Sequence, residues 1–96
     1  MKRHDVIKLL LKRKGITQKE LSKKIGISQT AISLILTGAN NPSDDTFSKI
    51  STVLEVPIAI INYMTLSEKD IPESKREIFR ILNPSMEAFL KKMFNI

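Results

Sequence analysis

The stretch Thr17–Thr37, which reads TQKELSKKIGISQTAISLILT, predicts two short helices joined by a tight turn. Thr17 lies three residues before Glu20, the spacing of a capping box at the start of a helix. Leu21 and Ile25 follow four residues apart, so they share one face of that helix. The first of the two helices is therefore short and apolar on one side.

A glycine separates the two helices. Gly26 ends the first helix, because glycine takes the left-handed conformation without a steric penalty. Ser28 then offers a side-chain oxygen to cap the second helix. Ile32 and Ile35 lie three residues apart on its inner side. The side chains expected on the outside of the pair are Gln18, Gln29, Thr30, Ser33 and Leu34.

The flanking sequence predicts three more helices. An apolar stripe indicates a first helix over residues 5–14, with Asp5 as its cap. Ser43 is expected to cap a fourth helix, and Pro57 to open a fifth that runs to about Tyr63. Five helices in about sixty residues, joined by short loops, make an all-α, compact domain.

The ordered set of residues in these helices resembles the lambda-repressor-like (Cro/C1, Xre-like) helix-turn-helix DNA-binding domain. The resemblance covers about residues 5–64 and leaves the last thirty uncovered. It rests on Gln18, Leu21, Ser22, Ile25, Gly26, Ile27, Ser28, Gln29, Ile32, Ile35 and Gly38, and continues through Pro42, Phe47, Ile50, Leu54, Val56 and Ile61.

The resemblance implies that the helix over residues 28–37 enters the major groove of double-stranded DNA. Its outward residues, expected on base edges, are Gln29, Thr30, Ser33 and Leu34. A glutamine side chain can form hydrogen bonds to both N6 and N7 of adenine at once, so Gln29 is the leading candidate for a base contact. Leu34 departs from the polar residue often found there and offers only apolar contact with a thymine methyl group.

The resemblance also implies a phosphate clamp at Gln18, where backbone N–H groups of a helix start point outward. The residues that flank this surface and are expected to add phosphate contacts are Lys19, Ser28, Thr37, Asn40 and Asn41. Plain solvent exposure is the alternative for each of them, and Ser28 is expected to cap its helix in either case.

Two apolar residues replace an ion pair that many members of the family carry. Those members pair an arginine in the first helix with a glutamate at the end of the third. The corresponding positions here are Leu11 and Leu36. We therefore expect a buried leucine contact, a replacement that is often neutral or stabilising.

The last third of the chain has a different character. Residues 65–73 are polar and contain Pro72, which predicts a linker. Ser74 with Glu77 forms a second capping-box pattern, and Asn83-Pro84 is expected to divide residues 74–96 into about two helices. Their apolar stripe is predicted to form a dimerisation element: Ile78, Phe79, Leu82, Met86, Phe89, Leu90, Met93 and Phe94. The stripe could instead fold back on its own domain or bind a different protein.

The composition of the chain limits the classes of function that it can have. Residues 1–25 carry nine lysines and arginines against two acidic residues, which favours a polyanion partner or a solvated basic surface. The chain has no cysteine and no apolar run long enough for a signal peptide or membrane span, so we expect a cytoplasmic protein. His4 has no ligand-spaced companions, and no catalytic motif is present, so we expect no enzyme, cofactor or metal.

Together these features predict a sequence-specific transcriptional regulator, a repressor that binds a pseudo-palindromic operator as a homodimer. Two other interpretations remain open. One is an antitoxin or antagonist whose C-terminal helices bind a different protein. The other is a basic protein that coats nucleic acid without sequence preference.

Overall fold

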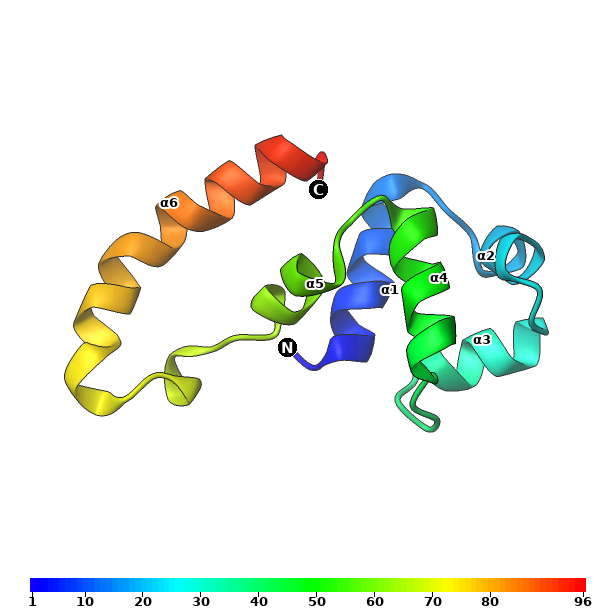
Figure 1. Cartoon of the computed structure of the whole chain (residues 1–96), viewed down its shortest axis with the longest axis horizontal. Coiled ribbons are helices and arrows are strands. Elements are labelled where there is room, and N and C mark those ends of the chain that lie inside the picture. Colours follow the sequence, from blue (N-terminus) through cyan, green and yellow to red (C-terminus); the bar gives the residue numbers. More distant parts are fainter.

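The computed structural model describes all residues, 1–96, and is helical throughout with no strand (Figure 1). Five helices form a globular body at one end of the molecule, and a sixth forms an arm at the other. The helices of the body are α1 (Arg3–Lys14), α2 (Gln18–Ile25), α3 (Gln29–Leu36), α4 (Asp44–Leu54) and α5 (Ile58–Met64). All five expected helices are present, with ends within about two residues of the predicted ones.

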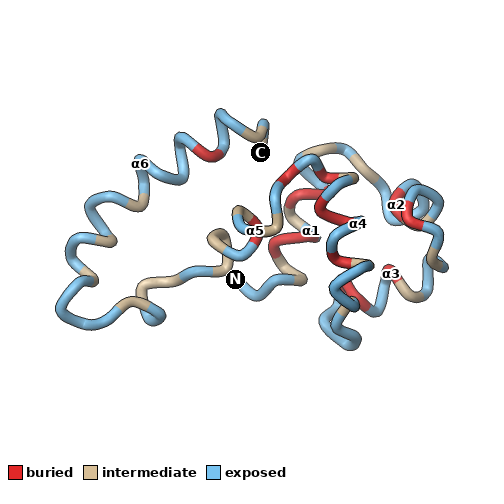
Figure 2. Tube along the Cα trace, viewed as in Figure 1, coloured by how far each residue is buried: buried red, intermediate tan, exposed pale blue.

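A single apolar core holds the five helices together. Fourteen buried residues from α1 to α5 form one cluster, and Figure 2 shows that buried residues gather in this body. Ile7, Leu10 and Leu21 are fully enclosed, as the predicted stripes require. The hydrophobic core that stabilises the fold therefore lies in the body.

The turn between α2 and α3 follows the predicted chemistry. The Thr17 hydroxyl oxygen accepts a hydrogen bond from the Glu20 backbone N–H at 3.1 Å and caps α2. Gly26 has φ of 73°, in the left-handed region, and ends that helix. The Ser28 hydroxyl oxygen accepts from the Ala31 N–H at 3.1 Å and caps α3. The caps fix where both helices begin, so they set the rotation of α3 about its axis.

Replacing Gly26 should destabilise the body. Gly26→Ala puts a Cβ at positive φ, and we expect the free energy of unfolding to fall by about 1–2 kcal/mol. Gly26→Asn is the matched control, because asparagine tolerates this conformation better. Urea denaturation followed by circular dichroism measures both variants. An alanine variant as stable as the wild type would contradict the role assigned to this glycine.

The start of α1 differs from the prediction. Asp5 is the third residue of the helix rather than its cap, because the helix begins at Arg3. The Asp5 carboxylate accepts a hydrogen bond from the Lys2 backbone N–H at 3.0 Å, one residue before the helix. An acidic side chain can accept hydrogen bonds from backbone N–H groups at a helix start either from the cap position or from within the first turn. The sequence pattern does not distinguish these two positions.

Leu11 and Leu36 are buried, as predicted from the replaced ion pair. They are 4% and 5% exposed and belong to the same core cluster. Their helices, α1 and α3, are in contact. The site where a charged pair is expected from the resemblance is thus part of the apolar core.

The C-terminal segment is one helix rather than two. After two short 3₁₀ turns, η1 (Glu68–Asp70) and η2 (Glu73–Lys75), α6 runs from Arg76 to Phe94 without a break. Pro84 lies inside it, and the helix is visibly curved (Figure 1), which is the usual consequence of a missing backbone N–H and the proline ring. Ser74 lies in η2 and caps no helix, so that prediction was wrong.

Side-chain hydrogen bonds brace α6 across the proline. Asn83 donates to the Glu87 carboxylate at 3.0 Å, and the Tyr63 hydroxyl of α5 donates to the Asn83 side-chain oxygen. These bonds tie the residue before Pro84 to the following turn and to the body. They give a local reason why Asn83-Pro84 does not end the helix.

The C-terminal end of α6 is attached to the body. The Lys14 ammonium donates to the Phe94 carbonyl at 2.7 Å, and Phe94 and Ile96 pack against the core. Leu90 is 7% exposed. At the other end, Arg80 pairs with Glu68 at 2.5 Å.

The apolar stripe of α6 therefore divides into two sets. Phe79, Leu90 and Phe94 are buried or half-buried within their own chain, so part of the predicted dimerisation set packs in cis. The others remain exposed: Ile78, Leu82, Met86, Phe89 and Met93, with Ile81 beside them. No helix of the chain combines the length and the apolarity needed to cross a membrane.

Candidate nucleic-acid interface

The α2–turn–α3 unit presents α3 at the outer end of the body, away from the arm (Figure 1). Ser22 supports the turn from inside, because its hydroxyl donates to the Ile27 carbonyl. This bond joins α2 directly to the turn that follows it. The orientation of α3 is thus set by Ser22, Gly26 and the Ser28 cap together.

The two faces of α3 have opposite character. Ile32, Ile35 and Leu36 are buried, which anchors the helix on the core. The four residues predicted to contact bases are all exposed: Gln29, Thr30, Ser33 and Leu34. Leu34 is 38% exposed, an apolar side chain that stays in solvent on a polar face. The first turn of α3 therefore offers a hydrogen-bonding tip, followed by an apolar spot.

The residues predicted to contact phosphates begin α2 or flank α3 in the sequence, and all are exposed: Gln18, Lys19, Ser28, Thr37, Asn40 and Asn41. Two of them also have structural roles. Ser28 caps α3, as described, and the Thr37 hydroxyl donates to the Leu34 carbonyl at 3.2 Å. Gln18 and Lys19 begin α2, where free N–H groups and the helix dipole favour an anion.

The structure adds a basic edge that the sequence analysis did not place. Lys2 and Arg3 share a surface hollow with Asn41, in the loop after α3. Arg3 lies over the Phe47 ring at 4.3 Å and donates to the Asn62 side chain at 3.3 Å, which leaves Lys2 as the free cation. The sequence shows that the start of the chain is basic, and the fold shows that it adjoins the loop after α3.

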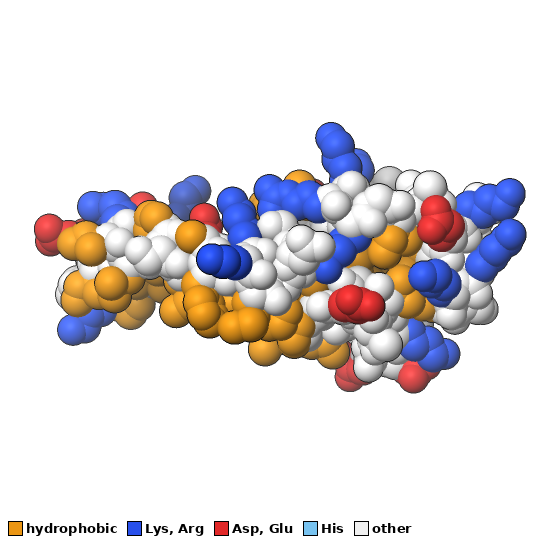
Figure 3. Space-filling model, turned by 90° about the horizontal axis from the view of Figure 1, so that it is seen from above, with side chains coloured by type: hydrophobic (Ala, Val, Ile, Leu, Met, Phe, Trp, Pro, Cys, Tyr) orange, Lys and Arg blue, Asp and Glu red, His pale blue; other side chains and the backbone are white.

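The local electrostatics suit an anionic partner. No acidic residue lies in the first turn of α3, and the Glu20 carboxylate accepts the Thr17 hydroxyl at 3.2 Å. The lysines and arginines are not confined to this end, since Figure 3 shows them spread along the molecule. No group of three His, Cys, Asp or Glu side chains is placed to hold a metal ion.

This arrangement, a core-anchored helix with an exposed polar tip set by a glycine turn, defines a helix-turn-helix DNA-binding domain. The chain belongs to the Cro/C1-type, lambda-repressor-like helix-turn-helix family. The family model described as Helix-turn-helix matches residues 7–61, which begin within α1 and end within α5.

Two curated relatives are similar to this chain, and both are named Antitoxin HipB. The protein from Escherichia coli K12 is 33% identical over 73 residues, which cover 76% of this chain and 83% of the relative. The protein from Escherichia coli O6:H1 (strain CFT073) is 41% identical over 56 residues, 58% of this chain and 60% of the relative. No solved structure gives a significant match. The family and these relatives are non-enzymatic kinds of protein.

Proposed function

We propose that the protein is a sequence-specific regulator of transcription in the cytoplasm, a repressor that places α3 in the major groove of double-stranded DNA. The observation that carries the proposal is the exposed Gln29–Thr30 tip of a helix whose other face is anchored in the core. Gln29 would form hydrogen bonds to adenine, and Thr30 would form a hydrogen bond to a base or contact a thymine methyl group.

Around this tip, Gln18, Lys19 and the loop residues Asn40 and Asn41 would fix the register of α3 through phosphate contacts, with Lys2 added at the edge. Such contacts carry no sequence information themselves. They would supply much of the affinity and make it depend on salt. Ser33 and Leu34 would extend the base-reading surface by one turn of the helix.

The repressor would act as a homodimer through α6. The support is the exposed apolar arc of Ile78, Leu82, Met86, Phe89 and Met93, of which Phe89 is 56% exposed. Apolar side chains at this spacing face one direction along a helix, so they suit pairing with a second helix. Two chains paired in this way have two-fold symmetry, which matches a pseudo-palindromic operator.

A competition assay tests whether binding is sequence-specific. A labelled duplex selected by the protein should stay bound in the presence of a large excess of random duplex at physiological salt. Complete displacement by the random duplex would indicate nonspecific coating and would contradict the proposal.

A second candidate function is that of an antitoxin, favoured by the similarity to two proteins of that name. In this case the exposed arc of α6 would bind a different protein, and α3 would still bind DNA. A second protein that co-purifies in stoichiometric amount with the wild type, but not with a variant altered in the arc, would favour this candidate. A purified chain that pairs with itself would favour the homodimer.

A further inference from the structure

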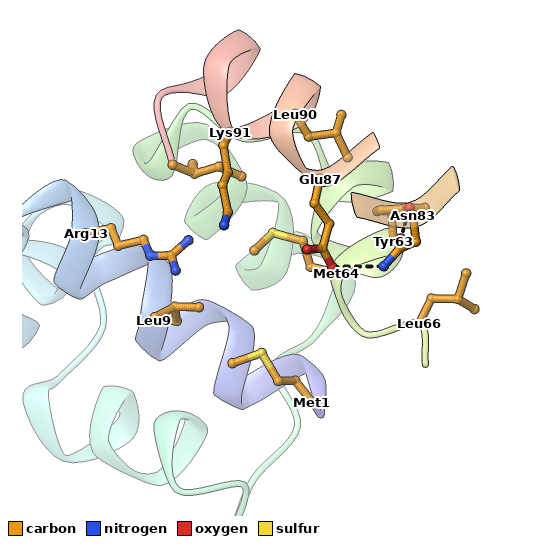
Figure 4. Close-up of a pocket in the computed structure, with 11 residues that line it drawn as sticks. Met1, Leu9, Arg13, Tyr63, Met64, Leu66, Asn83, Glu87, Leu90 and Lys91 are labelled. Atoms are coloured by element: carbon orange, nitrogen blue, oxygen red, sulfur yellow. Dashed lines mark hydrogen bonds between the residues drawn. The ribbon is translucent and has the colours of Figure 1, made fainter. Parts of the chain in front are cut away.

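A cavity of about 270 Å³ lies between the body and the arm, with α1 and α5 on one side and α6 on the other (Figure 4). None of its lining residues belongs to α2 or α3, so it is separate from the proposed DNA-binding surface. Its volume is near the lower end of the range for sites that hold small molecules.

Two cations from different helices meet at this cavity. Arg13 of α1 and Lys91 of α6 both line it, and Figure 4 shows their charged ends extending into the same space. Neither has an acidic partner among the ion pairs of the chain. Like charges that converge repel each other, and a shared anion would remove the repulsion.

The carboxylate side chain that lines the cavity, Glu87, is held by a hydrogen bond but keeps its charge. Glu87 accepts the hydrogen bond from Asn83, whose oxygen in turn accepts the Tyr63 hydroxyl. Burial and, to a lesser extent, the nearby Glu87 raise the pKa of Tyr63 above its usual value, so this hydroxyl keeps its proton. The cavity therefore has two cationic side chains and one carboxylate, so the charged side chains that line it carry a net positive charge.

The rest of the lining is apolar. The six other lining residues are methionine, leucine or isoleucine, and those that join the two parts of the molecule are Leu9, Met64, Leu90 and Ile96. An inorganic anion would leave these side chains against water. A ligand that carries a short hydrocarbon part would cover them and gain from their burial.

We propose that this cavity binds a small amphipathic carboxylate. Its carboxylate group would lie between Arg13 and Lys91, with charge-assisted hydrogen bonds from both. Its hydrocarbon part would pack against Leu9, Met64 and Leu90. Because the two cations belong to α1 and α6, the bound ligand joins the arm to the body. Ligand binding at this cavity would not require DNA binding by α3.

Octanoate is the probe, measured by isothermal titration calorimetry on the full chain. Arg13→Gln and Lys91→Gln should each raise the dissociation constant about tenfold, because each removes one charged hydrogen-bond partner. Lys12→Gln and Lys92→Gln are matched controls. Each removes the same charge from the neighbouring position of the same helix, outside the cavity, and should change the constant less than about twofold. Octanol, with the same chain and no charge, should bind at least about tenfold more weakly.

All four residues are exposed, so the variants should keep the helicity of the wild type in circular dichroism. Octanoate should also raise the melting temperature of the wild type and of both control variants. The proposal is overturned if the wild type shows no saturable octanoate binding, if the control variants lose as much affinity as the lining variants, or if octanol binds as well as octanoate.

Discussion

Gln29→Ala should lose discrimination at one base pair of each half-site while the protein remains folded. Gln29 is exposed at the start of α3 and has no hydrogen bond within the protein that the change would break. A bidentate glutamine–adenine contact accounts for about 1–3 kcal/mol of discrimination against the wrong base. We therefore expect a loss of roughly 5- to 150-fold on the preferred duplex. The measurement is a titration of duplexes that differ at one position.

Lys19→Ala is the control for this experiment. A lysine on a phosphate should weaken binding to every duplex alike and lower the dependence on salt, without changing which base is preferred. If Gln29→Ala instead weakened all duplexes by the same factor, Gln29 would not read bases directly. Circular dichroism of both variants checks that α3 is unchanged.

Phe89→Glu should convert the proposed α6 homodimer to a monomer. Phe89 lies within the exposed arc of α6, and a carboxylate there would have to be buried at the interface of the pair without a partner. Because the two DNA-binding domains would no longer be linked, the apparent operator affinity should fall by about 10²-fold or more. Sedimentation velocity reports the mass, and a gel-shift titration reports the affinity.

Ala88→Glu is the matched control for Phe89→Glu. It adds the same charge at the neighbouring exposed position of α6, about 100° around the helix and outside the arc. It should leave the dimer intact. A wild-type chain that is monomeric at micromolar concentration, or equal dissociation in the two variants, would refute the α6 homodimer and leave the second candidate function.

The body of this protein was predictable because its local signals agree with its packing. Thr17, Gly26 and Ser28 each fix a helix end through a bond or a backbone conformation that depends on near neighbours. The apolar stripes of α1 to α4 then indicate which face of each helix is buried in the core. The same logic predicted which residues of α3 would be exposed.

The arm was less predictable because its structure depends on contacts across the chain. Asn83-Pro84 is a strong local signal for a helix boundary, yet Tyr63 and Glu87 brace that position within one continuous helix. Leu90 and Phe94 belong to the same sequence stripe as Phe89, but they face the body. Lys2 became a candidate phosphate contact only when the fold placed it beside Asn41.

Selection of bound sequences from a random duplex pool tests the central claim, that α3 reads bases through its Gln29–Thr30 tip, most directly. We expect the wild type to enrich two inverted half-sites with a fixed spacing, each with an adenine whose preference disappears in the Gln29→Ala selection. A pool that stays random after repeated rounds, or the same enriched sequence from both proteins, would contradict it.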